Sequence, residues 1–180
     1  MYKIIGAVIL VLVVLTVLFL WLFKKPHVWI KSTSTNFNFS ISYPDTWSQS
    51  EDQTFFSLVD TKSSAKNFKS YIRIGKKDNS DNLFDKVYHL NPDSQVSELS
   101  EQSLVTRRKV IKGTNNTSVD GLKTFEVYEE TIMPGPYYSE AVFGLSGDKI
   151  YVFRLTADTR EELEREKPTF FGILQAVHFL

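Results

Sequence analysis

The sequence has no cysteine, and it has only three histidines. Without cysteine the chain can form no disulfide bond, no thiolate metal site and no lipidated cysteine for attachment to a membrane. The three histidines, His27, His89 and His178, are far apart in the sequence, and none is predicted to lie beside a hydroxyl group that it would activate as a nucleophile. We therefore expect a protein that is not an enzyme and that uses no cofactor.

An excess of charge of one sign is also missing. The 21 lysines and arginines equal the 21 aspartates and glutamates in number. Lys3, Lys24 and Lys25 flank an apolar segment, so residues 26–180 carry 18 basic side chains (21 minus 3) against 21 acidic ones, a net charge of −3. A protein that binds nucleic acid needs a concentrated basic face, and we therefore expect no nucleic-acid partner.

The longest apolar run comprises residues 4–23, which contain no charged side chain. At about 1.5 Å per residue, a helix of this length measures roughly 30 Å, the thickness of the hydrocarbon core of a bilayer. A cleaved signal peptide has a shorter apolar core and small residues at its cleavage site, whereas bulky residues such as Trp29 follow Lys24 and Lys25 here. The run predicts a retained transmembrane helix that contacts the lipid bilayer.

The charges near this helix give two opposing indications of its orientation. Lys3 precedes the helix and three lysines, Lys24, Lys25 and Lys31, follow it, which slightly favours a cytoplasmic domain. A short N-terminal tail before a single helix is, however, typical of a signal anchor, and long C-terminal domains translocate largely regardless of so small a bias. We expect a single-pass membrane protein whose C-terminal domain is extracytoplasmic.

Beyond the anchor, residues 24–36 predict a short polar linker, and residues 37–180 are long enough to form one domain with its own core. Residues 37–43 alternate between apolar and polar side chains, which predicts a half-buried strand that ends at Pro44. Turn signals separate the strands that follow, and short connections favour antiparallel neighbours. Further strands are expected at residues 54–60, 68–74, 105–111, 122–131, 137–145 and 150–157.

Helices are expected in the middle and at the end of this domain. Residues 81–90 have apolar side chains at helical spacing, and residues 94–104 predict a shorter helix. A last helix should begin at Asp158 or Thr159 as its cap, and Pro168 should break or restart it. The pattern as a whole predicts an α+β domain with one antiparallel sheet.

Three segments in a fixed order resemble the PsbP-like domains of the Mog1/PsbP superfamily. Residues 39–47 (FSISYPDTW) resemble the strand and Tyr-Pro-x-x-Trp sequence that opens these domains, and residues 119–124 (VDGLKT) are similar to the turn before their central hairpin. Residues 150–153 and 170–179 resemble the closing strand and tail, so the resemblance spans residues 37–180. It is closest to the bacterial membrane-attached members. It implies an antiparallel sheet flanked by helices in an α/β/α sandwich, and a role without catalysis.

One segment has the composition of a contact site for a partner. Met133, Pro134, Pro136, Tyr137 and Tyr138 are predicted to lie at a stiff hairpin tip that exposes apolar and aromatic groups, which suits contact with a protein or a glycan. A rigid turn whose tyrosines enter the next strand explains the same pattern. We expect a non-catalytic binding or assembly module with a membrane or envelope protein as its partner.

Two alternative functions stay open. His89 lies one helical turn after Asp85, so a surface hydrolase, or a protein that binds a small ligand or metal, would use these two side chains. Two ligands do not make a metal site, and nothing else in the sequence completes one. In the second alternative the domain is purely a structural spacer.

Two other patterns have structural explanations. Tyr43 and Trp47, on either side of Pro44, are predicted to cover one end of the core rather than to bind a ligand. The basic residues 107–109 predict a solvated edge strand that discourages pairing with other chains, because lysines and arginines at a sheet edge oppose the addition of a further strand.

Overall fold

The computed structural model describes residues 28–63, 68–88, 106–111, 118–131 and 137–180. These ranges contain ten strands, two α-helices and one short 3-10 helix. Their bounds, in chain order, are β1 (Trp29–Ser34), β2 (Phe39–Pro44), β3 (Trp47–Glu51), β4 (Phe56–Asp60), β5 (Tyr71–Asp78), η1 (Ser80–Asn82), α2 (Leu83–Tyr88), β6 (Thr106–Ile111), β7 (Lys123–Thr131), β8 (Tyr137–Ser146), β9 (Lys149–Ala157), α3 (Arg160–Gln175) and β10 (His178–Phe179).

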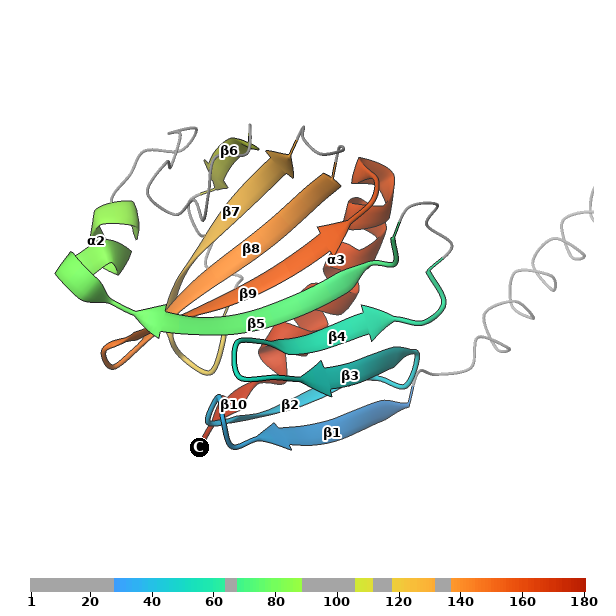
Figure 1. Cartoon of the computed structure of the whole chain (residues 1–180), viewed down its shortest axis with the longest axis horizontal. Coiled ribbons are helices and arrows are strands. Elements are labelled where there is room, and N and C mark those ends of the chain that lie inside the picture. The colour runs from blue at the N-terminus through green and yellow to red at the C-terminus, as the bar shows by residue number, and fades with distance from the viewer. Residues whose placement is uncertain (1–27, 64–67, 89–105, 112–117, 132–136) are drawn as a thin grey trace, which may run out of the picture.

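The strands form two antiparallel sheets. The large sheet has seven strands in the order β3-β4-β5-β9-β8-β7-β6, and the small sheet has three in the order β1-β2-β10. Figure 1 shows the small sheet beside β3, at one edge of the large sheet, and α3 behind the large sheet. Because β10 pairs with β2, the end of the chain completes the small sheet beside its middle strand.

The main core lies between the two sheets and α3. Alternate residues of β2, among them Phe39 and Ile41, are fully buried, as are Ile72 and Ile74 of β5. The apolar side of α3 packs against these strands and against β8 and β9. From α3 this core includes Leu163, Phe170, Ile173 and Leu174. Val177, which follows the C-terminal cap of α3, is also part of it.

A smaller core lies on the opposite face of the large sheet. Phe84 of α2 is buried against Phe125 of β7, with ring centroids 5.2 Å apart, and Phe125 is stacked on Phe143 of β8 at 4.8 Å. The side chains of Phe143 and of its neighbour in sequence, Val142, point to opposite faces of the sheet, as strand geometry requires. The described residues therefore place one helix on each face of the large sheet.

Most of the expected strands are confirmed. Residues 39–44 form β2 and end at Pro44, as the alternation predicted, and the six later strands are present as β4 to β9. The expected helix at residues 81–90 is present as η1 and α2 as far as Tyr88, and Thr159 caps α3. Tyr43 and Trp47 are buried in the main core, and β6 lies at an edge of the large sheet. The fold class is confirmed as an antiparallel α+β domain, but the expectation of one sheet was wrong, because β1, β2 and β10 form a second sheet.

The prediction of a linker at residues 24–36 was wrong for Trp29–Ser34, which form β1 and pair along their whole length with β2. Their side chains gave no strand signal because most of β1 is exposed, so no apolar alternation marks it. The backbone hydrogen bonds to β2, rather than burial, hold this segment in the sheet. The domain therefore begins several residues earlier than expected.

The prediction that Pro168 would break the last helix was also wrong, because α3 runs without interruption from Arg160 to Gln175. A proline inside a helix costs about 3 kcal/mol. Leu163 lies before Pro168, and Phe170 and Ile173 lie after it, all fully buried. Since burial of each such side chain contributes about 1.5 to 3 kcal/mol, packing on both sides outweighs the cost of the proline.

The described part of the chain contains no helix that is both long and apolar enough to cross a bilayer. The transmembrane helix expected at residues 4–23 lies outside the described residues, as does the short helix expected at residues 94–104. Membrane attachment therefore stays a prediction from the sequence.

Candidate binding surface

The tyrosines expected to contact a partner are placed at the start of β8, while Met133, Pro134 and Pro136 lie outside the described residues. Because successive residues of a strand point to opposite faces, the two tyrosines separate. Tyr138 packs against the main core under α3. The ring of Tyr137 lies near the ring of Phe68, with centroids 6.5 Å apart in an edge-to-face arrangement.

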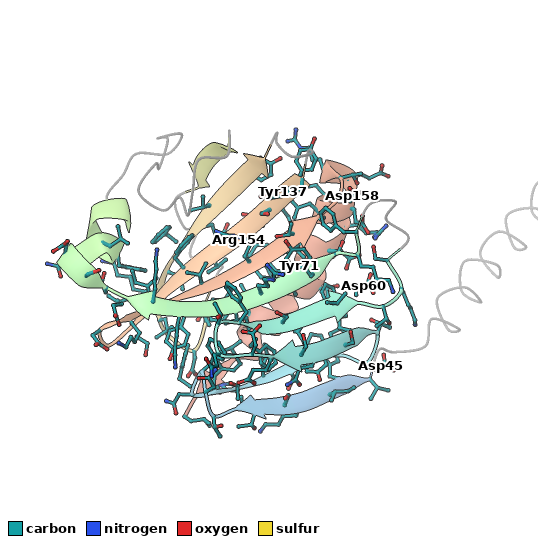
Figure 2. The ribbon with its side chains drawn as sticks, in the orientation of Figure 1. Asp45, Asp60, Tyr71, Tyr137, Arg154 and Asp158 are labelled. Carbon is teal, nitrogen blue, oxygen red and sulfur yellow. The ribbon has the colours of Figure 1, made fainter. Side chains whose placement is uncertain are left out.

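Tyr137 belongs to a group of polar and aromatic side chains that sequence reasoning did not find. The group lies on the large sheet, on the face opposite α3 and beyond the part that α2 covers. Figure 2 shows Tyr71, Tyr137 and Arg154 among the side chains of this face. We call it the polar-aromatic patch, and its members are Phe68, Tyr71, Arg73, Tyr137, Ser139, Arg154 and Thr156.

Strand register brings the patch together. Tyr71 of β5 pairs with Thr156 of β9, and Thr156 pairs in turn with Ser139 of β8. Two residues along, Arg73 pairs with Arg154. Residues that pair in neighbouring strands lie on the same face with Cβ atoms about 5 Å apart. β5 and the β8–β9 hairpin, which are distant in the sequence, therefore supply side chains to one face of the sheet, where Ser139 and Thr156 are buried.

The guanidinium group of Arg73 is held over aromatic rings. Its Cζ atom lies 4.8 Å from the centroid of Tyr71 and 5.4 Å from the centroid of Phe55. Each such cation-π contact contributes about 0.5 to 1 kcal/mol when it is exposed to solvent, and it restricts a side chain that is otherwise flexible. Arg73 is exposed, so its guanidinium edge is available to a partner while its face rests on the rings.

The electrostatic field at the patch is set by two arginines that face each other in register, Arg73 and Arg154. Asp52 lies close enough to respond to Arg73: hydrogen bonds from the backbone amides of Phe55 and Thr54 lower the pKa of Asp52, and the charge of Arg73 lowers it further. Arg154 is half-buried and also has an interaction partner within the protein. The patch is therefore basic and partly fixed by internal contacts.

Two hydroxyl groups lie at the base of the patch. The Oγ atom of Ser139 and the Oγ1 atom of Thr156 are hydrogen-bonded at 3.0 Å, and both residues are buried. Beside them, the ring of Phe68 contacts Tyr71 with centroids 5.9 Å apart. The hydroxyl groups satisfy each other, and the surface they support is built of rigid aromatic rings and one exposed arginine.

A second group of charged side chains lies under α3, on the other face of the sheet. Lys167 of α3 lies 3.1 Å from a carboxylate oxygen of Glu140 on β8, and 2.8 Å from Glu164 one turn before it. Burial raises the pKa of Glu140 to about 7, and Lys167 partly offsets this effect. Burial also raises the pKa of the nearby Glu126. Because Glu140 is enclosed between α3 and the sheet, we assign this group to stability rather than to binding.

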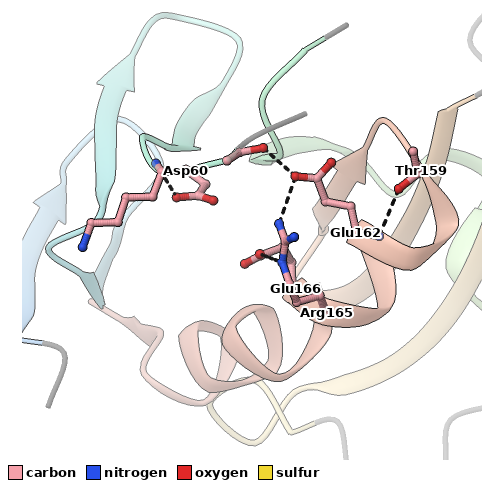
Figure 3. A network of polar contacts seen from close by, with 7 residues as sticks. Asp60, Thr159, Glu162, Arg165 and Glu166 are labelled. Carbon is pink, nitrogen blue, oxygen red and sulfur yellow. Dashed lines mark hydrogen bonds and ion pairs between the residues drawn. The ribbon is translucent and has the colours of Figure 1, made fainter. Parts of the chain in front are cut away.

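A third polar group fixes the start of α3 (Figure 3). The hydroxyl oxygen of Thr159 accepts a hydrogen bond from the amide of Glu162 at 3.1 Å, as a helix cap does. The carboxylate of Glu162 accepts hydrogen bonds from Ser63 and, at 3.0 Å, from Arg165. Arg165 also pairs with Glu166 at 2.9 Å. This network connects the segment after β4 to the helix, and each of its members has a structural role.

The alternative site at His89 and Asp85 gains no support from the described residues. Asp85 is exposed on α2 and forms an ion pair with Lys123 of β7 at 3.1 Å, and His89 lies outside the described ranges. Those ranges hold no group of three or more histidines, aspartates and glutamates that would bind a metal ion.

No model of a protein family matches the sequence, and no curated protein sequence matches it. Comparison with solved structures gives a clear likeness in fold. The solution structure of the cyanobacterial PsbP protein (CyanoP) from Synechocystis sp. PCC 6803 matches with a TM-score of 0.53 at 10% identity, over 88% of this chain and 96% of that one. The PsbP-like fold that the three sequence segments indicated is therefore confirmed.

Two further structures match less well. The Ran-binding protein Mog1p of Saccharomyces cerevisiae has a TM-score of 0.46 at 8% identity, over 85% of this chain and 96% of that one. LpqN of Mycobacterium tuberculosis, which is involved in cell envelope biogenesis, has a TM-score of 0.42 at 16% identity, over 86% of each chain. The assignment of the fold rests on the likeness to PsbP.

Proposed function

We propose that this protein is a single-pass membrane protein whose PsbP-like domain is a non-catalytic binding module for a protein of the membrane or envelope. The observation that carries the proposal is the polar-aromatic patch. Its tyrosines and arginines are the residue types in which the energetically important positions of protein interfaces are enriched. They also stand on three paired strands, so little conformational entropy is lost when a partner binds.

The chemistry of the patch favours an acidic partner surface that carries apolar side chains. Arg73 would donate hydrogen bonds to a carboxylate, and the rings of Phe68, Tyr71 and Tyr137 would cover apolar groups around it. The anchor expected at residues 4–23 would keep the domain close to the bilayer, which raises the effective concentration of a partner in the same membrane.

We further propose that the domain is extracytoplasmic. The motivation is the long domain that follows the apolar run of residues 4–23, because long C-terminal domains translocate largely regardless of a small charge bias. Protease treatment of intact cells or spheroplasts should then remove the domain. A domain that is cleaved only after the membrane is broken would overturn this orientation and leave the binding proposal untouched.

The binding proposal is tested by crosslinking in native membranes, followed by detergent extraction. Wild-type protein should recover a defined partner, and the variant Arg73→Glu combined with Tyr137→Ala should lose it. Lys62→Glu is the matched control, since it reverses a charge at an exposed lysine outside the patch. Circular dichroism and thermal denaturation should show the same folded domain in all three proteins.

The alternatives predict different outcomes. If the patch variant keeps every crosslink, the patch is not the contact surface. If deletion of the whole domain leaves the partner assembled, the domain is a spacer. A protein that copurifies with nothing and turns over a small molecule would support the enzyme alternative at His89 and Asp85.

A further inference from the structure

Three consecutive apolar side chains are exposed where the described domain begins. Val28 is 64% exposed, Trp29 is 45% exposed and Ile30 is 42% exposed. Val28 directly precedes β1, Trp29 and Ile30 are its first two residues, and the next residue, Lys31, is exposed as well. A soluble domain tolerates single exposed apolar residues, whereas a contiguous set that includes tryptophan indicates a surface that contacts something.

This apolar end of β1 is held rigidly. Ile30 pairs with Tyr43 of β2, and the carbonyl oxygen of Val28 accepts a hydrogen bond from the amide of Asp45 at 2.8 Å. The ring of Trp29 lies against α3, because a Cβ atom at Gly172 would be only 3.3 Å from its Cη2 atom. The backbone that carries these three side chains is therefore fixed, with Trp29 and Ile30 on opposite faces of the end of β1.

The length of chain before Val28 limits what can cover this surface. The apolar run ends at residue 23, so four residues, 24–27, separate it from Val28. The five Cα–Cα steps from residue 23 to residue 28 reach at most about 18 Å when the chain is fully extended. If residues 4–23 cross a bilayer, Val28 must lie within about 18 Å of the hydrocarbon core, in or just outside the headgroup region.

We propose that Val28, Trp29 and Ile30 insert into the interfacial region of the bilayer, and that the domain rests on the lipid surface through this end of β1. The inference depends on the anchor in the proposed function and adds a defined orientation to it. Tryptophan is enriched at this depth in membrane proteins because its ring is apolar and its N–H group finds polar partners there.

The charges of the described residues at this end of the domain oppose each other. Lys31 would attract anionic headgroups, and the exposed carboxylate of Asp45 lies at the same corner and opposes that attraction. Lys24 and Lys25, which precede Val28 in the sequence, would add to the attraction of anionic lipid. Figure 1 shows β1 and β6 at opposite sides of the molecule, so docking through β1 directs β7 and β8 away from the bilayer.

The absence of cysteine allows a clean test with the full-length chain. Single cysteines at Ile30→Cys, Ser50→Cys and Val17→Cys are labelled with an environment-sensitive fluorophore in vesicles of phosphatidylcholine and phosphatidylglycerol. Ser50 is the matched control, because it is exposed and the neighbouring Glu51 pairs with Ser34 at the far end of β1. Lipids with quenchers at shallow and deep positions then report the depth of each probe.

The proposal predicts strong quenching of the Ile30 probe by shallow quenchers and several-fold weaker quenching of the Ser50 probe. Equal, weak quenching at both positions, with a deeply quenched Val17 probe, would overturn the inference and leave the anchor intact. If the Val17 probe is not quenched and the protein does not float with the vesicles, the anchor proposal itself fails. Weak quenching of the Ile30 probe that increases as the protein is diluted in lipid, with disulfides between unlabelled Ile30→Cys copies, would assign the surface to a second copy of the chain instead.

Discussion

The Nζ atom of Lys167 lies 3.1 Å from Oε2 of Glu140, and this ion pair joins the middle of α3 to β8, an inner strand of the large sheet. The side chain of Glu140 is only 2% exposed and that of Lys167 is 21% exposed. Burial is the main influence on Glu140, because it raises the pKa to about 7 despite the nearby ammonium group. The pair therefore makes the stability of the domain depend on pH near neutrality.

Glu140→Gln should remove part of that dependence. Since the pKa of Glu140 rises from an ordinary value of 4.5 to about 7 on folding, the folded state binds the proton more tightly. The wild-type free energy of unfolding should then fall as pH rises from about 4.5 to about 7, by up to about 3 kcal/mol. The glutamine variant should be at least as stable as wild type at pH 8. Urea denaturation at pH 5 and at pH 8 measures how the free energy of unfolding changes with pH in wild type and in Glu140→Gln.

Glu164→Gln is the control for this prediction, because Glu164 also pairs with Lys167 but is 53% exposed. Its stability should follow the wild-type pH dependence. Lys167→Met should lose more stability at pH 8 than at pH 5, since it leaves an ionised Glu140 without its partner. Identical pH slopes in wild type and Glu140→Gln would contradict the assignment.

Asp120→Asn should loosen the end of the chain. Oδ2 of Asp120 accepts a hydrogen bond from the amide of Phe179 at 2.8 Å, and this bond, with a second from His178, lowers the pKa of Asp120. A lowered pKa stabilises the fold above the ordinary value of 3.8, and this stability is lost as pH falls through the lowered pKa. Asparagine keeps the positive φ of 46° but removes the charge.

Hydrogen exchange measured by NMR checks this prediction. The Phe179 amide should exchange several-fold faster in Asp120→Asn, and the amides of β8 should be unchanged. Glu161→Gln removes a carboxylate from an exposed position in α3 and serves as the control. Unchanged exchange at Phe179 would mean that pairing of β10 with β2 alone holds the tail.

Phe84→Ala should release α2 from the sheet. Phe84 is 1% exposed and contacts Phe125. Truncation of a buried phenylalanine costs about 3 to 5 kcal/mol. Denaturant unfolding should show that loss, whereas Leu83→Ala, at a half-buried neighbour, should cost clearly less. Equal costs would show that the side of α2 bearing Phe84 does not fix the helix.

Gly172→Ala should stabilise α3 slightly. Alanine is favoured over glycine inside a helix by about 1 kcal/mol. Its Cβ atom would meet Trp29 at 3.3 Å, and the half-exposed ring can move by a few tenths of an ångström. Thermal denaturation should show a gain below about 1 kcal/mol. Gly172→Leu should instead displace Trp29 and shift its fluorescence, and a loss of stability in the alanine variant would show that Trp29 is fixed.

The alternation in β2 and the cap of α3 could be predicted because they are local. Phe39 and Ile41 repeat with the period of a strand, and Thr159 begins a helix with acidic residues in its first turn. The burial of Tyr43 and Trp47 followed from the same local pattern. The PsbP-like fold could be predicted from three short segments because their patterns are also local, since each combines a turn with one side of the core.

The polar-aromatic patch could not be predicted, because its members meet only through strand order. Arg73 and Arg154 are far apart in the sequence. The local pattern around each arginine predicts only a polar residue on the solvent-facing side of a strand. Only the placement of β5 beside β9 makes them neighbours. An alternating strand shows which residues share a face, but it does not show which strands lie next to each other.

The sequence by itself determined the elements with a strong period or cap, the absence of thiol chemistry and the apolar run at residues 4–23. Tertiary structure decided the rest. It placed Trp29–Ser34 in a sheet through backbone hydrogen bonds, kept α3 continuous through Pro168 by burial on both sides, and enclosed Glu140 beneath Lys167. In each case the deciding energy comes from groups distant in the chain, which local propensity does not contain.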